Sequence, residues 1–121
     1  MSELGKKIWV FPDAYLPAKG NPYKTSASGD QFGHESLCIL NYAEKDANLI
    51  IDFLYEDEEP INNFKMIVGT KKSLHLRLDN IRVNDMYLPR EKPYSIILKS
   101  DINIVAQLSR LDTTSQFNSF M

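Results

Sequence analysis

The sequence is poor in cysteine and in long apolar runs, and each shortage excludes a class of protein. Cys38 is the single cysteine among 121 residues, so no internal disulfide can form, and we expect its thiol to pack as a small apolar group in the run 37–40. No stretch approaches the roughly 18 apolar residues that a membrane-spanning helix needs. The polar start is followed only by the short run 8–11, which Pro12 ends, so no signal peptide is expected. We therefore predict a cytoplasmic protein without direct membrane insertion.

The sequence also lacks an excess of positive charge. It carries 14 basic and 16 acidic side chains, a formal net charge of −2, with both signs mixed along the chain. Because a positive field attracts a polyanion, this balance disfavours nucleic acid as a partner. Hydrophobic residues at 43% and charged residues at 25% are ordinary for a folded globular protein. At this length we expect one hydrophobic core, and thus a single domain over residues 1–121.

Short apolar runs separated by turns indicate an all-β fold. We predict strands at 8–11, 35–41, 48–55, 64–68, 73–78, 94–99 and 102–111. Alternation is cleanest in 73–78, where the leucines share one face and His75 and Arg77 share the other. About seven to eight strands with turns at short intervals favour an antiparallel β-sandwich of the jelly-roll kind.

The links between these runs suggest how the strands pair. Short polar links favour two hairpins, one of 35–41 with 48–55 and one of 64–68 with 73–78. Ser100 and Asp101 predict a turn between the last two strands. The stretch 12–33, rich in proline, glycine and small polar residues, predicts a long loop, and long loops in compact domains usually have a function.

Catalytic motifs are scarce. The sequence has no glycine-rich phosphate loop before a helix, no nucleophile elbow and no cysteine pair with zinc spacing. We therefore favour a non-enzymatic protein with no cofactor and no metal. One alternative stays open, a metal-assisted sugar-processing enzyme with His34, Glu35 and His75 as ligands. Jelly-roll metalloenzymes usually place two histidines one residue apart on a strand, however, and these two histidines lie on different predicted elements.

Polar residues gather at strand ends and on one strand face. Glu35 begins a predicted strand, Arg77 lies on the wet face of another, and Arg110 closes the last. Arginine is suited to bidentate capture of a carboxylate or a phosphate. The pattern fits two arrangements equally well, a ligand pocket and an arginine–carboxylate network that only ties strand ends together.

Five strings of residues resemble the Anabaena sensory rhodopsin transducer family, in the same order and with similar gaps. They are Trp9 with DAYLP at 13–17, FGHESLCILN at 32–41, Glu59 with Pro60, HLR at 75–77 and QLSRLD at 107–112. The segment 19–31 is longer than the matching loop of the family. The resemblance implies a small β-sandwich that forms a homotetramer and a soluble cytoplasmic protein that interacts with a microbial rhodopsin. Relatives without a rhodopsin are proposed to bind sugars or related metabolites.

Carried over residue by residue, the resemblance marks ten positions as ligand-binding or interface residues. They are His34, Glu35, Asn41, His75, Arg77, Gln107, Arg110 and Asp112, with Trp9 and Tyr15 as aromatic neighbours.

These observations together predict a homo-oligomeric, non-enzymatic protein that binds a small molecule or relays a signal. In this hypothesis His34, Glu35, Arg77 and Arg110 line a pocket for a sugar or an anionic metabolite. A protein partner is the remaining alternative, as in a dedicated soluble transducer of a membrane photoreceptor.

Overall fold

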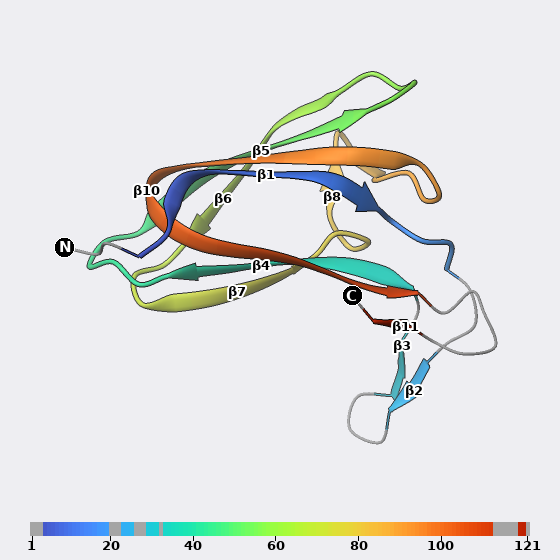
Figure 1. Ribbon diagram of the computed structural model, residues 1–121, viewed down its shortest axis with the longest axis horizontal. Coiled ribbons are helices and arrows are strands. Elements are labelled where there is room, and N and C mark those ends of the chain that lie inside the picture. Colours follow the sequence, from blue (N-terminus) through green and yellow to red (C-terminus); the bar gives the residue numbers. More distant parts are fainter. Residues whose placement is uncertain (1–3, 20–22, 26–28, 32, 113–118, 121) are drawn as a thin grey trace.

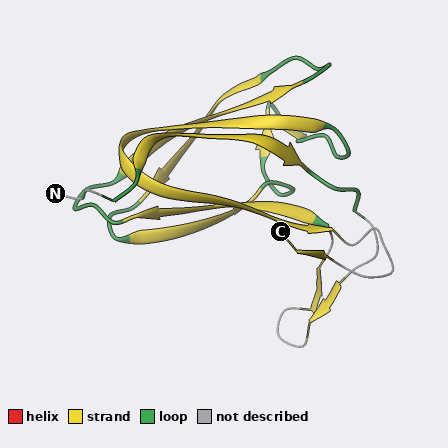
Figure 2. Cartoon of the chain, in the orientation of Figure 1, coloured by secondary structure: helices red, strands yellow, loops and turns green. Residues whose placement is uncertain are grey.

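The computed structural model describes residues 4–19, 23–25, 29–31, 33–112 and 119–120, which form strands and turns (Figures 1 and 2). The strands are β1 (Lys6–Tyr15), β2 (Tyr23–Thr25), β3 (Gly29–Gln31), β4 (His34–Asn41), β5 (Ala47–Tyr55), β6 (Ile61–Val68), β7 (Lys72–Arg77), β8 (Arg82–Val83), β9 (Met86–Tyr87), β10 (Pro93–Asp112) and β11 (Ser119–Phe120). The prediction of an all-β fold built from antiparallel strands is confirmed. Within these residues there is no helix long and apolar enough to cross a membrane.

Strand β10 is the centre of the fold. It is 20 residues long and stands in the middle of the sheet order β6-β5-β10-β4-β7, and β1 and β11 pair with it as well. Its first half pairs with β5 on one side and with β1 on the other, whereas its second half pairs with β4. Figure 1 shows β10 curving between these halves, so that β1, β5 and β6 form one layer and β4 and β7 the facing layer.

The turn expected at Ser100 and Asp101 is wrong, because the chain stays in strand conformation through this point. The two strands predicted on either side of it are one bent strand. The Asp101 carboxylate accepts hydrogen bonds from the backbone N–H and the Nδ2 of Asn48, both at 2.9 Å. The Ser100 hydroxyl oxygen accepts one from the N–H of Ile102 at 3.3 Å. Ser100 and Asp101 thus mark a bend in β10, before which the strand pairs with β5 and after which it pairs with β4.

Both predicted hairpins are also wrong. β4 and β5 do not pair with each other, since each pairs with a different half of β10. β6 and β7 lie at opposite ends of the sheet order, where β6 pairs with β5 and β7 with β4. Alternation along a strand tells which side chains face the core, but both layers share that core, so the pattern does not tell which layer a strand joins.

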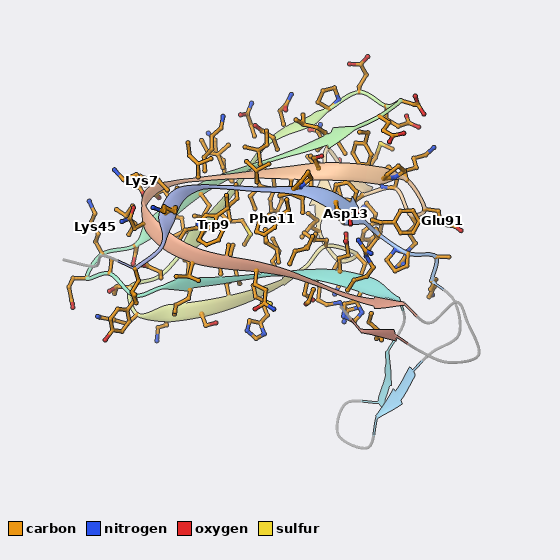
Figure 3. All side chains as sticks on the ribbon, viewed as in Figure 1. Lys7, Trp9, Phe11, Asp13, Lys45 and Glu91 are labelled. Atoms are coloured by element: carbon orange, nitrogen blue, oxygen red, sulfur yellow. The ribbon has the colours of Figure 1, made fainter. Side chains whose placement is uncertain are left out.

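The core lies between the two layers. Its fully buried side chains include Leu37 and Ile39 of β4, Ile51 and Phe53 of β5 and Ile96 of β10. Trp9 and Phe11 of β1 are partly buried against this core, with ring centroids 6.4 Å apart, and Figure 3 shows both in the space between the layers.

Trp9 also fastens β1 at the bend of β10. Its indole Nε1 donates to the carbonyl oxygens of Ile104 at 3.0 Å and Lys6 at 3.1 Å. A buried indole N–H normally finds such a partner. Trp9, which was predicted as an aromatic neighbour of the site, thus makes a structural contact at the end of the sandwich where β10 bends.

Two long connections, the first between β1 and β4 and the second between β7 and β10, each contain a short two-stranded ribbon. The first strand extends to Tyr15, past the predicted end at residue 11, and β2 pairs with β3 within the predicted loop. β8 pairs with β9 in the second connection. Asn84 and Asp85 between them have φ angles of 54° and 63°, as the tight turns that suit twisted hairpins require.

We predict that Asp101→Ala lowers the free energy of unfolding by about 1 kcal/mol at neutral pH, because two backbone and side-chain donors of Asn48 lose their acceptor. These hydrogen bonds lower the pKa of Asp101 below its usual 3.8. Their contribution is therefore present above pH 3.8 and is lost as the pH falls through the lowered value. Urea unfolding at pH 7 and at pH 2.5 measures both effects.

Asp57→Ala is the matched control, since Asp57 is an exposed aspartate in the link between β5 and β6. It should change the stability by less than about 0.5 kcal/mol. Equal effects of the two substitutions would show that the Asp101 contacts do not stabilise the bend.

Candidate functional site

The carboxylate of Glu35 lies inside the sandwich. In β4 the side chains of Glu35, Leu37, Ile39 and Asn41 alternate with more exposed ones, so the register of the strand points Glu35 to the core side, where it is 0% exposed. A carboxylate without water must find donors from the protein. It accepts hydrogen bonds from the N–H of Tyr15 at 2.9 Å and from the hydroxyl of Tyr94.

Arg110 completes the partners of Glu35. The two residues are directly opposite in the β4–β10 register. The Nε and Nη2 of Arg110 donate to Oε2 of Glu35 at 3.2 and 3.1 Å, and Nη2 also reaches the carbonyl oxygen of Asp13 at 3.4 Å. The side chain of Arg110 is 14% exposed, and its guanidinium lies 5.9 Å from the centre of the Tyr15 ring. Glu35, Arg110 and Tyr94 therefore form a buried ion-pair network.

Two stacked tyrosines adjoin this network. The rings of Tyr55 and Tyr94 are 5.2 Å apart. The hydroxyl of Tyr55 is buried and has no hydrogen-bond partner among the described residues. Burial raises the pKa of Tyr55 to about 12, and the nearby carboxylates of Glu35 and Glu58 add to the rise. Burial and then Glu35 raise the pKa of Tyr94 as well. Both phenols stay protonated at neutral pH.

A second arginine cluster lies near the surface, at the end of β7. Arg77 donates to the carboxylate of Asp79 through Nε at 2.8 Å and Nη2 at 2.7 Å, in bidentate geometry. Arg90 lies 3.5 Å from the same carboxylate through Nη2. Its Nη1 donates to the carbonyl oxygens of Pro17 at 2.7 Å and Gly33 at 2.8 Å. One carboxylate thus orients two guanidinium groups, one from the end of β7 and one from the link between β9 and β10.

These two arginines line a surface cleft of about 510 Å³, which we call the arginine cleft. Its full lining is Leu16, Lys19, Arg77, Asp79, Asn80, Tyr87, Leu88 and Arg90. Three cationic side chains and one carboxylate are among these lining residues. Asp79 is 7% exposed, whereas Arg77 and Arg90 are 31% and 28% exposed, so it is the cations that solvent reaches.

The structure places the predicted site residues on both faces of the layer that β4, β7 and the second half of β10 form. His75 and Arg77 share a face as predicted, and it is the face of β7 turned away from the core leucines. In the register, His75 lies opposite Cys38, which lies opposite Gln107. His34 occupies the same side of β4 as Cys38. The grouping of His34, Glu35, Arg77 and Arg110 in one pocket is therefore not formed, because Glu35 and Arg110 lie between the layers.

Asn41 has a structural environment at the other end of β4. It is fully buried, and its Nδ2 donates to the carbonyl oxygens of Lys45, Val68 and Gly69 at 2.9, 3.0 and 3.2 Å. Asp112 ends β10, and its side chain lies outside the described part of the chain.

The residues of the alternative metal site do not converge. Glu35 lies between the layers, while His34 and His75 are on the outward sides of β4 and β7. No group of three or more histidine, cysteine, aspartate or glutamate side chains in the described part of the chain is placed to hold a metal ion.

Of the residues that line the arginine cleft, sequence reasoning found only Arg77, and it missed the three other charged ones, Lys19, Asp79 and Arg90. Asp79 follows Arg77 by two residues, and this spacing is a local signal for a pair at the end of a strand. Lys19 and Arg90 lie in two connections that are distant in sequence, so only the fold brings them together.

Comparison with known proteins agrees with the resemblance in the sequence. The family model described as Anabaena sensory rhodopsin transducer matches residues 4–121. The crystal structure of Thermotoga maritima 1070 is similar with a TM-score of 0.80 and 39% identity, over 98% of this chain and 90% of that chain. The structure of the Anabaena sensory rhodopsin transducer is similar with a TM-score of 0.69 and 26% identity, over 89% of this chain and 91% of that chain. Among curated proteins nothing matches.

We predict that Glu35→Gln lowers the free energy of unfolding by about 3 kcal/mol, because it leaves the largely buried guanidinium of Arg110 without a counter-charge. Glu44→Gln is the matched control, since it breaks the exposed pair with Lys71, in which the side chains are 81% and 43% exposed, and should cost less than about 1 kcal/mol. Chemical unfolding of both variants tests this. Similar losses in the two would contradict the assigned role of Glu35.

We predict that stability falls in alkali through Tyr55. Its pKa is raised from 10 to about 12 in the folded protein, so the native state keeps its proton longer than the unfolded chain does. The stabilisation from this difference is complete below pH 10 and is lost as the pH rises towards 12. Tyr55→Phe should flatten this decline, and at neutral pH it should cost less than about 1 kcal/mol because the hydroxyl has no partner in the described residues.

The measurement is urea unfolding between pH 8 and pH 12, with tyrosinate absorbance recorded in parallel. Tyr42→Phe, at a tyrosine that is 52% exposed, is the control and should leave the decline unchanged. An unchanged decline in Tyr55→Phe would refute the assignment.

Proposed function

The chain belongs to the Anabaena sensory rhodopsin transducer family, and we propose that it is a non-catalytic, cytoplasmic protein that binds a small polar or anionic ligand and relays a signal. A shared scaffold does not by itself specify a function, which depends on the site. The observation that carries the proposal is the arginine cleft.

The size and lining of the arginine cleft support ligand binding. Its volume of about 510 Å³ lies within the range of small-molecule sites, which is about 300 to 1,000 Å³. Leu16 and Leu88 supply apolar walls, Tyr87 an aromatic one, and the charged groups converge from separate segments. Apolar walls with a few convergent polar groups are the usual construction of such sites.

The contacts of Arg90 support a relay. The same guanidinium that lines the cleft also holds the carbonyl oxygens of Pro17 and Gly33. A ligand that draws on Arg90 competes with these hydrogen bonds and so changes the connection between β1 and β4. A protein partner that reads this connection would receive the signal. The relative named a sensory rhodopsin transducer makes a membrane photoreceptor one candidate for that partner.

The test is a thermal-shift screen of sugars, sugar phosphates, carboxylic acids and nucleotides. We predict that at least one compound raises the melting temperature of the natural chain and that Asn80→Trp, which fills the cleft without changing its charge, abolishes the shift. Asn80 is exposed, so the substitution should be tolerated by the fold.

Asn62→Trp is the matched control, because Asn62 is an exposed asparagine of β6 outside the cleft. It should retain the shift. The proposal fails if no compound stabilises the natural chain, or if Asn80→Trp and Asn62→Trp behave alike.

A second property, self-association, is favoured by four exposed apolar side chains on one outer face. Ile8 and Val10 of β1, Ile50 of β5 and Ile67 of β6 are 62%, 56%, 37% and 64% exposed. The registers place Ile8 and Ile50 on opposite sides of Lys99, and Lys65 lies beside Ile50, so these apolar side chains share the outer side of the β1–β10–β5–β6 layer with two lysines. Several exposed apolar side chains on one face, bordered by polar ones, commonly mark an interface. We propose that a second copy of the chain covers it, within the tetramer that the family resemblance implies.

We predict that Val10→Lys reduces the molar mass measured by light scattering after size exclusion, because a buried lysine in the interface would lack a partner. Ser73→Lys, on the outward side of the other layer, is the control and should leave the mass unchanged. A monomeric natural chain, or an assembly that Val10→Lys does not weaken, would refute self-association through this face.

A further inference from the structure

We propose that the free edge of β7, the side turned away from β4, binds an extended segment of a partner protein as an additional antiparallel strand. The partner segment has apolar side chains opposite the two leucines of β7 and an acidic side chain opposite Lys72. The inference rests on the proposed function for the existence of a protein partner, and it adds where that partner binds and which side chains it brings.

The backbone hydrogen bonds show which groups of β7 are unused. β7 pairs with β4 alone in the described part of the chain, and Figure 1 shows it at the margin of its layer. Just past β7, the N–H of Leu78 donates to the carbonyl oxygen of Glu35 at 2.9 Å, in the same register. Bonded and non-bonded pairs alternate along an antiparallel ladder, so the two leucines of β7 also bond to β4. The N–H and C=O groups of Ser73 and His75 therefore point away from β4 and form the free edge.

This edge lacks the features that shield two other edge strands. β1 contains Pro12 and a register shift beside it, and β6 has a register shift against β5, with Asn63 at a φ angle of 64°. Bulges and prolines of this kind hinder the addition of another strand. The pairs of β7 with β4, in contrast, run without a shift along the whole strand. β7 is therefore regular enough to receive a further strand.

Apolar surface beside the free edge is only half covered. Leu74 and Leu76 pack against the core but remain partly exposed. Their register partners in β4, Ile39 and Leu37, are 1% and 0% exposed, because β7 covers them. A strand beside β7 would place its own alternate side chains next to the two leucines and cover them in the same way. Burial of this apolar surface would add to the free energy of the backbone hydrogen bonds.

Charge decides which segment fits the edge. β7 carries no acidic side chain, and Lys72 at its start is exposed and has no ion-pair partner in the part of the chain that the structure describes. Opposite charges in directly opposite positions stabilise a pair of strands, whereas like charges destabilise it. A segment with a carboxylate opposite Lys72 is therefore favoured. The β7 strand of a second copy has no carboxylate to offer, so the edge does not provide its own complement.

The position of the edge suits a relay. β7 ends at Arg77, whose guanidinium lines the arginine cleft and is held there by Asp79. A strand added along β7 therefore ends beside the cleft. A ligand in the cleft and a partner on the edge would contact neighbouring parts of one strand.

The test uses the capped peptide acetyl-TVTVTE-amide, which in antiparallel pairing sets its valines opposite Leu76 and Leu74 and its glutamate opposite Lys72. Two-dimensional ¹⁵N–¹H NMR and amide hydrogen exchange of the full chain measure the binding. Without peptide, the amides of Ser73 and His75 should exchange fast and those of the two leucines slowly. With peptide, we expect saturable shifts and slowed exchange at Ser73 and His75.

Two matched peptides test the hydrogen bonds and the charge separately. N-methylation of the third and fifth residues, which lie opposite His75 and Ser73, removes two donors and should weaken binding about tenfold or more. Replacement of the glutamate by lysine should weaken binding about threefold. Lys72→Glu in the protein should reverse this preference between the two peptides.

Ser73→Pro is the principal variant of the chain. The N–H of Ser73 points away from β4, so proline removes a donor of the free edge without removing a hydrogen bond of the sheet. This variant should lose binding, whereas Ser73→Ala keeps the N–H and should bind within about twofold of the natural chain. The amide spectrum of each variant reports whether the fold is intact, and the N-methylated peptide gives the same test on the natural chain.

The outcomes separate this inference from the proposed function. The inference fails if the peptide does not bind, if its N-methylated form binds equally well, or if protection appears only outside β7. Equal affinities of the glutamate and lysine peptides would overturn the acidic partner. If Ser73→Pro lowers the molar mass measured by light scattering, a second copy covers the edge instead of a separate partner. In each case the thermal-shift screen with Asn80→Trp still decides ligand binding at the arginine cleft.

Discussion

The buried carboxylate of Glu35 is the contact on which the shape of this sandwich depends. β10 is one bent strand whose two halves belong to different layers. Its two ends must therefore lie close together for the layers to face each other. Tyr94, near the start of β10, and Arg110, near its end, both bind Glu35. Tyr15 at the end of β1 adds its N–H to the same carboxylate. A single charged group, kept from water, thus holds together the end of the sandwich opposite the bend at Asp101.

The two arginine clusters contain the same arginine–carboxylate pairing but differ in burial, and the difference in burial gives them different roles. Arg110 is 14% exposed and its charge is matched by Glu35, so the pair stabilises the interior and leaves little for a ligand. Arg77 and Arg90 share the one carboxylate of Asp79 near the surface, where their side chains are 31% and 28% exposed. The first cluster is therefore closed to solvent, while the guanidinium groups of the second are accessible to a ligand.

Predictability from the sequence followed the range of the interactions. Alternation in 73–78 correctly placed His75 and Arg77 on one face, because neighbouring side chains on a strand must point to opposite sides. The same local rule does not tell which strands pair, so the two predicted hairpins were wrong. It also does not tell a turn from a bend, so the prediction split the single strand β10 into two strands at Ser100. Glu35 and Arg110, which were predicted to lie together, are adjacent because the register sets them opposite each other. Arg77 lies on the opposite face of the same layer.

The sequence by itself determined the all-β character, the approximate positions of most strands and the family, because these depend on local side-chain patterns and on strings of residues. Only the tertiary structure decided that β10 serves both layers, that Glu35 joins its ends, and that Lys19, Arg77 and Arg90 line one cleft. These features join residues distant in sequence, whose proximity is set by strand pairing and layer closure rather than by any pattern along the chain.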